Sequence, residues 1–193
     1  MSSRGPGRPR SEPVRQAVLA AAVHLIGEDG YGRLTMEGIA REAGVSKQTL
    51  YRWWPTKAAI VLEALNEGAA KIAPSVDTGL FSADLRVFLR RSVAGTGGRN
   101  RRLLAALMAA AQLDDAFAES FRAGFLARRR QALRELLERG RDRGELGASA
   151  DLDFLVELVF ATLWYRILAH NKPLNRHFAD QLADTLLTLA GTG

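Results

Sequence analysis

Two short helical segments joined by a glycine turn, within residues 35–57, constrain this chain more than any other feature of its sequence. The first segment has apolar residues at the i, i+3, i+4 and i+7 positions of a helix, namely Met36, Ile39, Ala40 and Ala43. Thr35 precedes them as the expected N-cap, and Gly44 ends the segment because glycine tolerates the left-handed backbone of a tight turn. The pattern predicts a helix-turn-helix, a unit that lays its second helix in the major groove of DNA.

The second segment begins after Ser46, a further expected N-cap, and points Leu50 and Trp54 inward with Val45. Its outward residues are amides, hydroxyls, cations and an aromatic, which suit base edges and phosphates. We expect base contacts from Gln48, Thr49 and Arg52, and phosphate contacts from Thr35, Lys47, Tyr51 and Lys57. The plain alternative is two short helices meeting at a glycine turn, as in many helical proteins.

The identities of the residues add to the spacing. Thr35, Ile39-Ala40, Ala43-Gly44-Val45-Ser46, Leu50-Tyr51, Trp54 and Lys57 closely resemble the DNA-binding domain of the TetR family of transcriptional regulators. One departure is Trp54, where the family usually has Phe, although a large aromatic keeps the core role. The resemblance implies a regulator, most often a repressor, that binds DNA as a homodimer and carries a pocket for a small-molecule effector in its second domain.

Positive charge is concentrated at the start of the chain. The net charge is +6 over 193 residues. Residues 1–60 carry nine Lys or Arg and five Asp or Glu, a net +4, and residues 61–193 carry 18 and 16, a net +2. This asymmetry fits a nucleic-acid face near the helix-turn-helix. Residues 1–10 hold three Arg and no acid, so we expect a flexible basic arm. Its Arg8 and Arg10 enter the minor groove in one interpretation; in the other, the arm only aids solubility.

Helical patterns run through the rest of the chain, which predicts an all-α fold of about nine helices. The clearest break is APSVDTG at 73–79. We therefore expect a helix-turn-helix DNA-binding domain over 11–72, ending in a linking helix at 57–71, and an effector-binding and dimerisation domain over 73–193. Lys57 stands at the start of the linking helix, where a cation opposes the helix dipole unless a DNA phosphate faces it. The alternative is an exposed lysine without a role.

Two apolar helices near the end of the chain predict a homodimer. The segment 152–170 is apolar nearly all round, and 175–189 has one apolar face. Together they form half of a four-helix interface in our interpretation, or simply complete a monomer core in the alternative. The expected interface residues are Leu155, Leu158, Val159, Phe178, Leu182 and Leu186.

The second domain also contains the side chains that we expect to line the effector pocket implied by the resemblance. They are apolar or aromatic residues at helical spacing: Leu103, Leu107, Met108, Phe117, Phe121, Phe125, Trp164, Tyr165 and Leu168. Such stripes are also typical of plain core. Because almost no charge interrupts these segments, the expected effector is mainly hydrophobic.

Other classes of protein fit the sequence poorly. Cysteine is absent, and His24, His170 and His177 lack zinc-site spacing, so we expect no metal and no cofactor. No nucleophile motif or phosphate loop is visible, which argues against an enzyme. No apolar run approaches the roughly 18 residues of a membrane span, and we expect a cytoplasmic protein. The alternative function is a helical adaptor that binds no DNA. This alternative does not explain why Tyr51, Arg52 and Lys57 are present in the motif.

Overall fold

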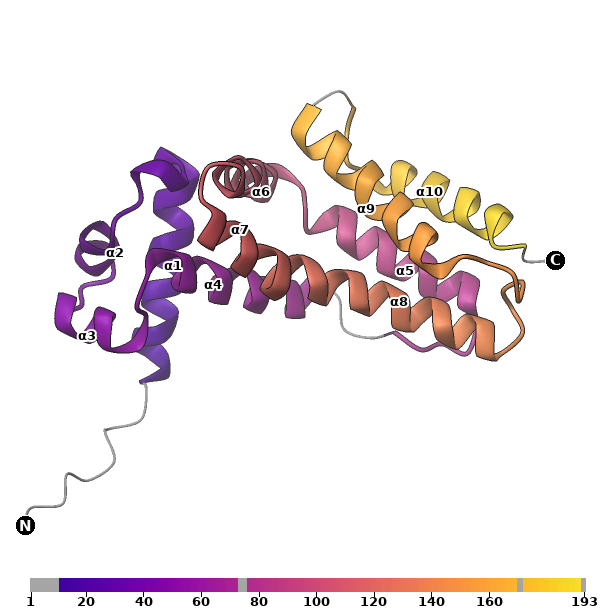
Figure 1. Ribbon diagram of the computed structural model, residues 1–193, viewed down its shortest axis with the longest axis horizontal. Helices are drawn as coiled ribbons and strands as arrows, with labels where there is room; N and C mark the ends of the chain where they lie inside the picture. Colours follow the sequence, from indigo (N-terminus) through magenta and orange to yellow (C-terminus); the bar gives the residue numbers. More distant parts are fainter. Residues whose placement is uncertain (1–10, 73–75, 170–171, 192–193) are drawn as a thin grey trace, which may run out of the picture. The chain divides into compact units, whose positions relative to one another are not determined.

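The helices expected from the sequence are present in the computed structural model, which describes residues 11–72, 76–169 and 172–191 (Figure 1). Within these ranges there is no strand, which confirms the all-α fold. Contacts divide the chain into two compact units, Met1–Ala64 and Leu65–Gly193. The division falls inside α4 (Lys57–Ile72), earlier than the break expected at 73–79. One continuous helix therefore connects the two units.

The first unit is built from short helices around a small core. Its elements are α1 (Glu12–Asp29), the 3-10 turn η1 (Tyr31–Arg33), α2 (Met36–Glu42), α3 (Lys47–Trp53) and the first turns of α4. α1 packs against α2, and α2 packs against α3. Every element supplies buried side chains, among them Val18, Ala22, Ile26, Tyr31, Ile39, Leu50, Ile60 and Val61. This packing holds the two helices of the motif against α1.

The second unit contains the longer helices. They are α5 (Phe81–Ala94), α6 (Gly98–Ala111), α7 (Asp115–Phe121), the π-helical segment η2 (Arg122–Leu126), α8 (Ala127–Asp142), α9 (Leu152–Ala169) and α10 (Arg176–Leu189). The backbone stays helical from α7 through η2 to α8, so these three elements form one long helix. Counted in this way, the described residues contain the nine helices that the sequence predicts. None of them is both long and apolar enough to cross a membrane.

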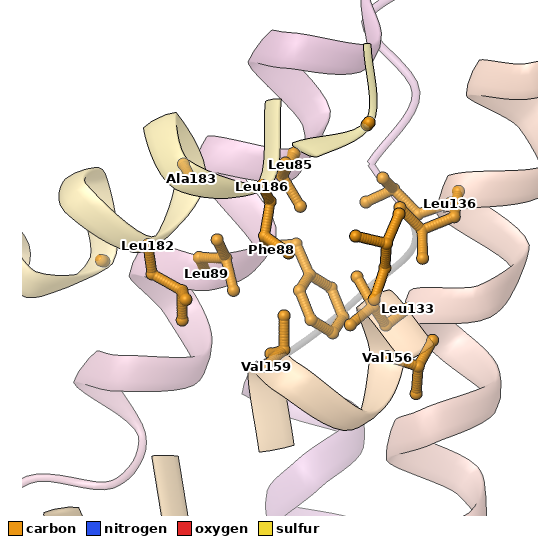
Figure 2. Close-up of a cluster of buried hydrophobic side chains, with 14 of the residues drawn as sticks. Leu85, Phe88, Leu89, Leu133, Leu136, Val156, Val159, Leu182, Ala183 and Leu186 are labelled. Carbon is orange, nitrogen blue, oxygen red and sulfur yellow. The ribbon is translucent and has the colours of Figure 1, made fainter. Parts of the chain in front are cut away.

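Four helices of the second unit share one apolar core. α5 packs against α8 and α10, and α8 packs against α9. Figure 2 shows Phe88 of α5 among side chains that come from the other three helices. The labelled members of this cluster are Leu85, Phe88 and Leu89 of α5, Leu133 and Leu136 of α8, Val156 and Val159 of α9, and Leu182, Ala183 and Leu186 of α10. Burial of this apolar surface is the main source of stability in the unit.

The same core corrects the dimer interface expected from the sequence. Five of the six residues named for it are buried inside the single chain: Leu155, Val159, Phe178, Leu182 and Leu186. Side chains that already fill their own core cannot form the contact face of a dimer. Leu158 is half-buried. The five side chains belong to the core because α10 packs against α5 and α9 packs against α8, and periodicity does not tell which neighbour an apolar face packs against.

The opposite face of α9 carries exposed apolar side chains. Phe154, Tyr165 and Leu168 are 54%, 63% and 47% exposed, and the exposed Ala161 lies between them on the same face. Leu189 at the end of α10 is 57% exposed. Exposed apolar residues that gather on one face mark an interaction surface more often than scattered ones do.

A buried carboxylate fixes the start of the second unit. The Asp84 side chain is fully buried, and its Oδ1 accepts hydrogen bonds from the backbone N–H and the hydroxyl of Thr78, at 2.8 and 2.7 Å. The guanidinium of Arg143 lies 3.5 Å from the other oxygen. Glu145 accepts a 2.7 Å hydrogen bond from the backbone N–H of Phe81. These contacts tie the segment before α5 to the end of α8.

Candidate nucleic-acid interface and effector region

The turn between α2 and α3 has the geometry that its sequence predicts. The Thr35 hydroxyl accepts a 3.0 Å hydrogen bond from the backbone N–H of Gly38, which caps α2. Gly44 adopts a φ of 65°, the left-handed conformation that favours glycine. The backbone N–H groups of Gly44 and Val45 then bond to the carbonyls of Arg41 and Ala40, a Schellman C-cap. These three contacts fix the direction in which the chain enters α3.

The start of α3 is held by Ser46. Its hydroxyl oxygen accepts from the backbone N–H of Thr49 at 3.1 Å, and its O–H donates to the Thr49 hydroxyl at 2.9 Å. Leu50 and Trp54 are 0% and 2% exposed, as their spacing predicts. Val45 is half-buried in the turn. The inward face of the expected recognition helix is therefore confirmed.

The outward face of α3 presents polar and charged groups. Lys47, Gln48, Tyr51 and Arg52 are exposed, and Thr49 is half-buried. The Lys47 ammonium lies 3.3 Å from the Glu37 carboxylate of α2. A backbone N–H, and then this ammonium, hold the pKa of Glu37 below its ordinary value.

A three-residue polar contact, here named the Trp54 clamp, joins three helices of the first unit. The indole N–H of Trp54, at the end of α3, donates to Glu63 of α4 at 2.7 Å. The other oxygen of Glu63 accepts from Arg15 of α1 at 2.6 Å. Phe, the usual residue of the family at this position, has no N–H to offer. The indole of Trp54 therefore gives this chain a link between α3 and α4 that Phe does not provide.

Lys57 has partners within the protein. Its ammonium donates to the carbonyl oxygens of Tyr31 and Leu34, at 3.2 and 3.0 Å, and lies 4.5 Å from the centre of the Tyr31 ring. These contacts explain a lysine at the start of α4 without DNA, because backbone carbonyl oxygens receive the ammonium where a phosphate was expected. Lysine has three N–H donors, and a phosphate contact through the remaining one stays a prediction. Arg8 and Arg10 lie outside the described residues.

The side chains expected to line an effector pocket fall into two groups. Leu103, Leu107, Phe117, Phe121 and Phe125 are buried, and Met108 and Trp164 are half-buried. The exposed Tyr165 and Leu168 do not belong with them. Their assignment to an interior cavity was wrong, because they lie on the outer face of α9 described above.

The aromatic members of the buried group form a continuous row. The rings of Phe117 and Phe121 stack with their centres 5.7 Å apart, and those of Phe121 and Phe125 stack at 5.4 Å. The ring of Trp164 on α9 meets Phe121 edge-on at 6.4 Å. We name Phe117, Phe121 and Phe125 the aromatic row. It runs from α7 into η2, and sequence spacing alone placed its members on one face.

Two surface hollows lie apart from the predicted pocket residues. The larger, of about 440 Å³, is formed by η2, α8 and the start of α9: Arg122, Leu126, Ala127, Arg130, Gln131, Arg134, Asp153 and Val156. The smaller, of about 430 Å³, lies along α8 between Ala127 and Glu135. Arg134 pairs with Asp153 across the larger hollow. Neither hollow contains a side chain of the aromatic row.

A capped recognition helix with a polar outward face, followed by a helical second unit, defines a class of protein: the helix-turn-helix regulator of transcription. Comparison with known families agrees over both units. Residues 18–64 match the bacterial regulatory proteins of the tetR family, and residues 75–186 match the tetracyclin repressor-like C-terminal domain. The chain belongs to the TetR family of DNA-binding transcriptional regulators. The resemblance found in the sequence is confirmed.

Relatives of similar length support this assignment. The chain is 33% identical over 176 residues to the uncharacterized HTH-type transcriptional regulator YdeS of Bacillus subtilis, covering 91% of this chain and 89% of YdeS. It is 30% identical over 182 residues to the DNA-binding transcriptional repressor TetR of Mycobacteroides abscessus, covering 92% and 94%. The crystal structure of the TetR family regulator SCO0332 is similar with a TM-score of 0.76 at 34% identity, covering 92% of this chain and 98% of SCO0332. Each of these similarities spans both units.

Proposed function

We propose that this chain is a homodimeric repressor that occupies a palindromic operator and leaves it when a small-molecule effector binds the second unit. The observation that carries the proposal is α3, whose Leu50 is buried while Gln48, Tyr51 and Arg52 face outward from a helix that Ser46 caps. The repressor of Mycobacteroides abscessus and the family membership support the direction of the effect. A DNA operator as partner places the protein in the cytoplasm.

The outward residues of α3 divide into two roles. Gln48, Thr49 and Arg52 read base edges, because amides, hydroxyls and guanidinium groups match their donors and acceptors. Thr35, Lys47, Tyr51 and Lys57 hold phosphates, which supply affinity and its dependence on salt rather than specificity. Lys57 has a second, structural role through Tyr31 and Leu34.

The dimer forms through the exposed face of α9. Phe154, Tyr165 and Leu168 present apolar surface along this helix. An identical face from a second copy covers these side chains around a two-fold axis. Dimerisation gives the operator its symmetry, because two recognition helices then read half-sites about 34 Å apart.

The effector acts by linkage. It binds the state of the dimer that is unable to hold the operator more tightly than the state that holds it, and DNA weakens the effector by the same factor. The interior of the second unit around the aromatic row is apolar, so the body of the effector is apolar too.

Binding to the DNA upstream of the chain's own gene tests the proposal. The purified protein is titrated onto this DNA and onto shuffled DNA across a salt series. We expect the protein to bind the upstream DNA tightly. Its affinity for both DNAs should fall steeply as the salt concentration rises. Binding that is equal for all sequences and lost at physiological salt would sink the proposal.

Two variants and a control separate the roles of the residues. Arg52→Ala should cost about 1–3 kcal/mol on the operator and relax base preference, whereas Lys57→Ala should weaken all sequences alike. Arg91→Ala removes a similar charge from α5 in the second unit and should leave the preference between the two DNAs unchanged. If Arg52→Ala and Lys57→Ala acted alike on every sequence, the division into base and phosphate contacts would be wrong.

A further inference from the structure

Arg129 continues the aromatic row. Phe117, Phe121, Phe125 and Arg129 follow one another at intervals of four residues along α7, η2 and α8. The three phenylalanines are buried and Arg129 is half-buried. Its guanidinium carbon lies 5.8 Å from the centre of the Phe125 ring. A half-buried cation therefore follows a row of three buried aromatic side chains.

Among the described residues, this guanidinium has no anionic partner. Arg129 donates no hydrogen bond and lies at ion-pair distance from no carboxylate, and its one polar contact is the face of Phe125. Nearby arginines differ: Arg122 pairs with Glu119, and Arg134 pairs with Glu138 and Asp153. Burial lowers the pKa of Arg129 below its ordinary value. The group is partly removed from water without compensation by an anion.

Such an arrangement is costly in a protein that only has to fold. A buried charge is normally paired, because the water lost from its surface has to be replaced. A cation–π contact with Phe125 offsets part of this cost, but less than a charge-assisted pair with a carboxylate would. The neighbouring Arg128 and Arg130 avoid the cost because they are exposed. Uncompensated groups of this kind gather where a ligand completes the contacts.

We propose that Arg129 binds the anionic group of the effector, and that the apolar body of the effector enters beside Phe125, where neither surface hollow reaches and the buried side chains separate to admit it. A single guanidinium pairs with one planar anion in a two-pronged contact, which favours a carboxylate. The effector is then an apolar monoanion, a narrower class than the hydrophobic ligand expected from composition. This inference rests on the effector site of the proposed function.

Matched acid and neutral probes test the inference without DNA. Naphthoate is compared with naphthamide, and decanoate with decanol, by isothermal titration and thermal unfolding of the full-length protein. At least one acid should bind the wild type about tenfold or more tighter than its neutral partner, as expected for a charge-assisted pair. Arg129→Met should remove this preference, and Arg129→Lys should keep part of it. Arg128→Met, the exposed neighbour, should bind as the wild type does.

The free protein supplies a second readout. Because an unpaired cation is replaced by an apolar side chain of similar length, Arg129→Met should melt at the same temperature as Arg128→Met or higher. A lower melting temperature would show that the guanidinium is already satisfied, and would overturn the inference. Acids that bind no better than their neutral partners, or equally well to Arg129→Met, would overturn it too. A failure of the proposed function is detected separately: the protein without any probe would then not bind the operator.

Discussion

Different kinds of contact stabilise the interior of each of the two units. In the first unit, short helices are fixed by caps, a Schellman turn and the Trp54 clamp, each a contact between named polar atoms. In the second unit, α5, α8, α9 and α10 are held by one apolar core, and its buried side chains come from positions far apart in the sequence. The caps and the turn join residues that are close in the sequence, so they keep a sequence signature, whereas the Trp54 clamp joins the distant Arg15 and Glu63. A core made of distant contacts accepts many sequences. The sequence therefore predicts the turn and the caps of the first unit more directly than it predicts the core contacts of the second.

The largest expected effect separates core from interface in the second unit. Leu186→Ala should lower the free energy of unfolding by about 2–5 kcal/mol, because it leaves a cavity in the shared core. Tyr165→Ala, on the exposed face of α9, should change the stability of the monomer by less than about 0.5 kcal/mol and weaken the dimer instead.

Urea unfolding over a range of protein concentrations, with sedimentation equilibrium, distinguishes these two outcomes. The loss in Leu186→Ala should persist at every concentration, and the loss in Tyr165→Ala should appear only where the wild type is dimeric. A Tyr165→Ala protein that dimerises like the wild type would move the interface elsewhere.

A close helix packing in the second unit gives the next effect. A Cβ added at Gly140 of α8 would lie 2.6 Å from side-chain atoms of Leu146 and the buried Phe81. Gly140→Ala should therefore destabilise the protein by about 1–3 kcal/mol through overpacking, despite the better helix propensity of alanine.

Gly68→Ala on α4 is the matched control, because a Cβ there meets no atom of the described residues within 4 Å. It should stabilise the protein by about 0.5–1 kcal/mol, as alanine does in an open helix. Thermal unfolding of the two variants side by side gives the comparison. The two substitutions should change the melting temperature in opposite directions. Changes in the same direction would contradict the close approach of Gly140 to Phe81.

In the first unit, Trp54→Phe tests the clamp. It should cost about 1.5 kcal/mol, the lower end for a hydrogen bond to a charged group, because Arg15 still neutralises Glu63. Glu63→Gln is the partner variant: its amide oxygen still accepts from the indole, but the ion pair with Arg15 is lost. Unfolding and operator affinity are measured together. A Trp54→Phe protein with wild-type values in both would show that the packing of the ring, and not its N–H, positions α3.

The smallest effect concerns the cap of the recognition helix. Ser46→Ala should cost about 1 kcal/mol, because the backbone N–H of Thr49 loses its acceptor. Ser46→Thr keeps a hydroxyl and should restore most of the loss. Amide hydrogen exchange in α3 measures the fraying directly. Unchanged exchange in Ser46→Ala would mean that packing of Leu50 alone holds the start of the helix.

Local chemistry explains which features the sequence predicts correctly. Thr35, Gly44 and Ser46 act on residues within a few positions of themselves, so their roles follow from order along the chain. The internal partners of Lys57 were missed, because the carbonyls of Tyr31 and Leu34 lie 26 and 23 residues away and become available only when η1 forms. No pattern of residue types marks such a contact.

The second unit shows what helix periodicity does not predict. Helix positions were predicted well, since the expected helix at 152–170 matches α9 (Leu152–Ala169) closely. Which of its two apolar faces packs inward depends on α5 and α8, and single-helix periodicity carries no information about them. Phe154 lies on the outer face, and only the packing of the neighbouring helices identifies that face as exposed.

The π-helical segment η2 sets the phase of the long helix that contains it. An α-helix turns by about 100° with each residue, so residues four apart drift by about 40° around the helix at each step. The wider turn of η2 takes up more residues than an α-turn does, which reduces this drift between Phe121 and Phe125. Ordinary α-turns in its place would carry the Phe125 ring around the helix, away from its stack on Phe121, without changing either side chain.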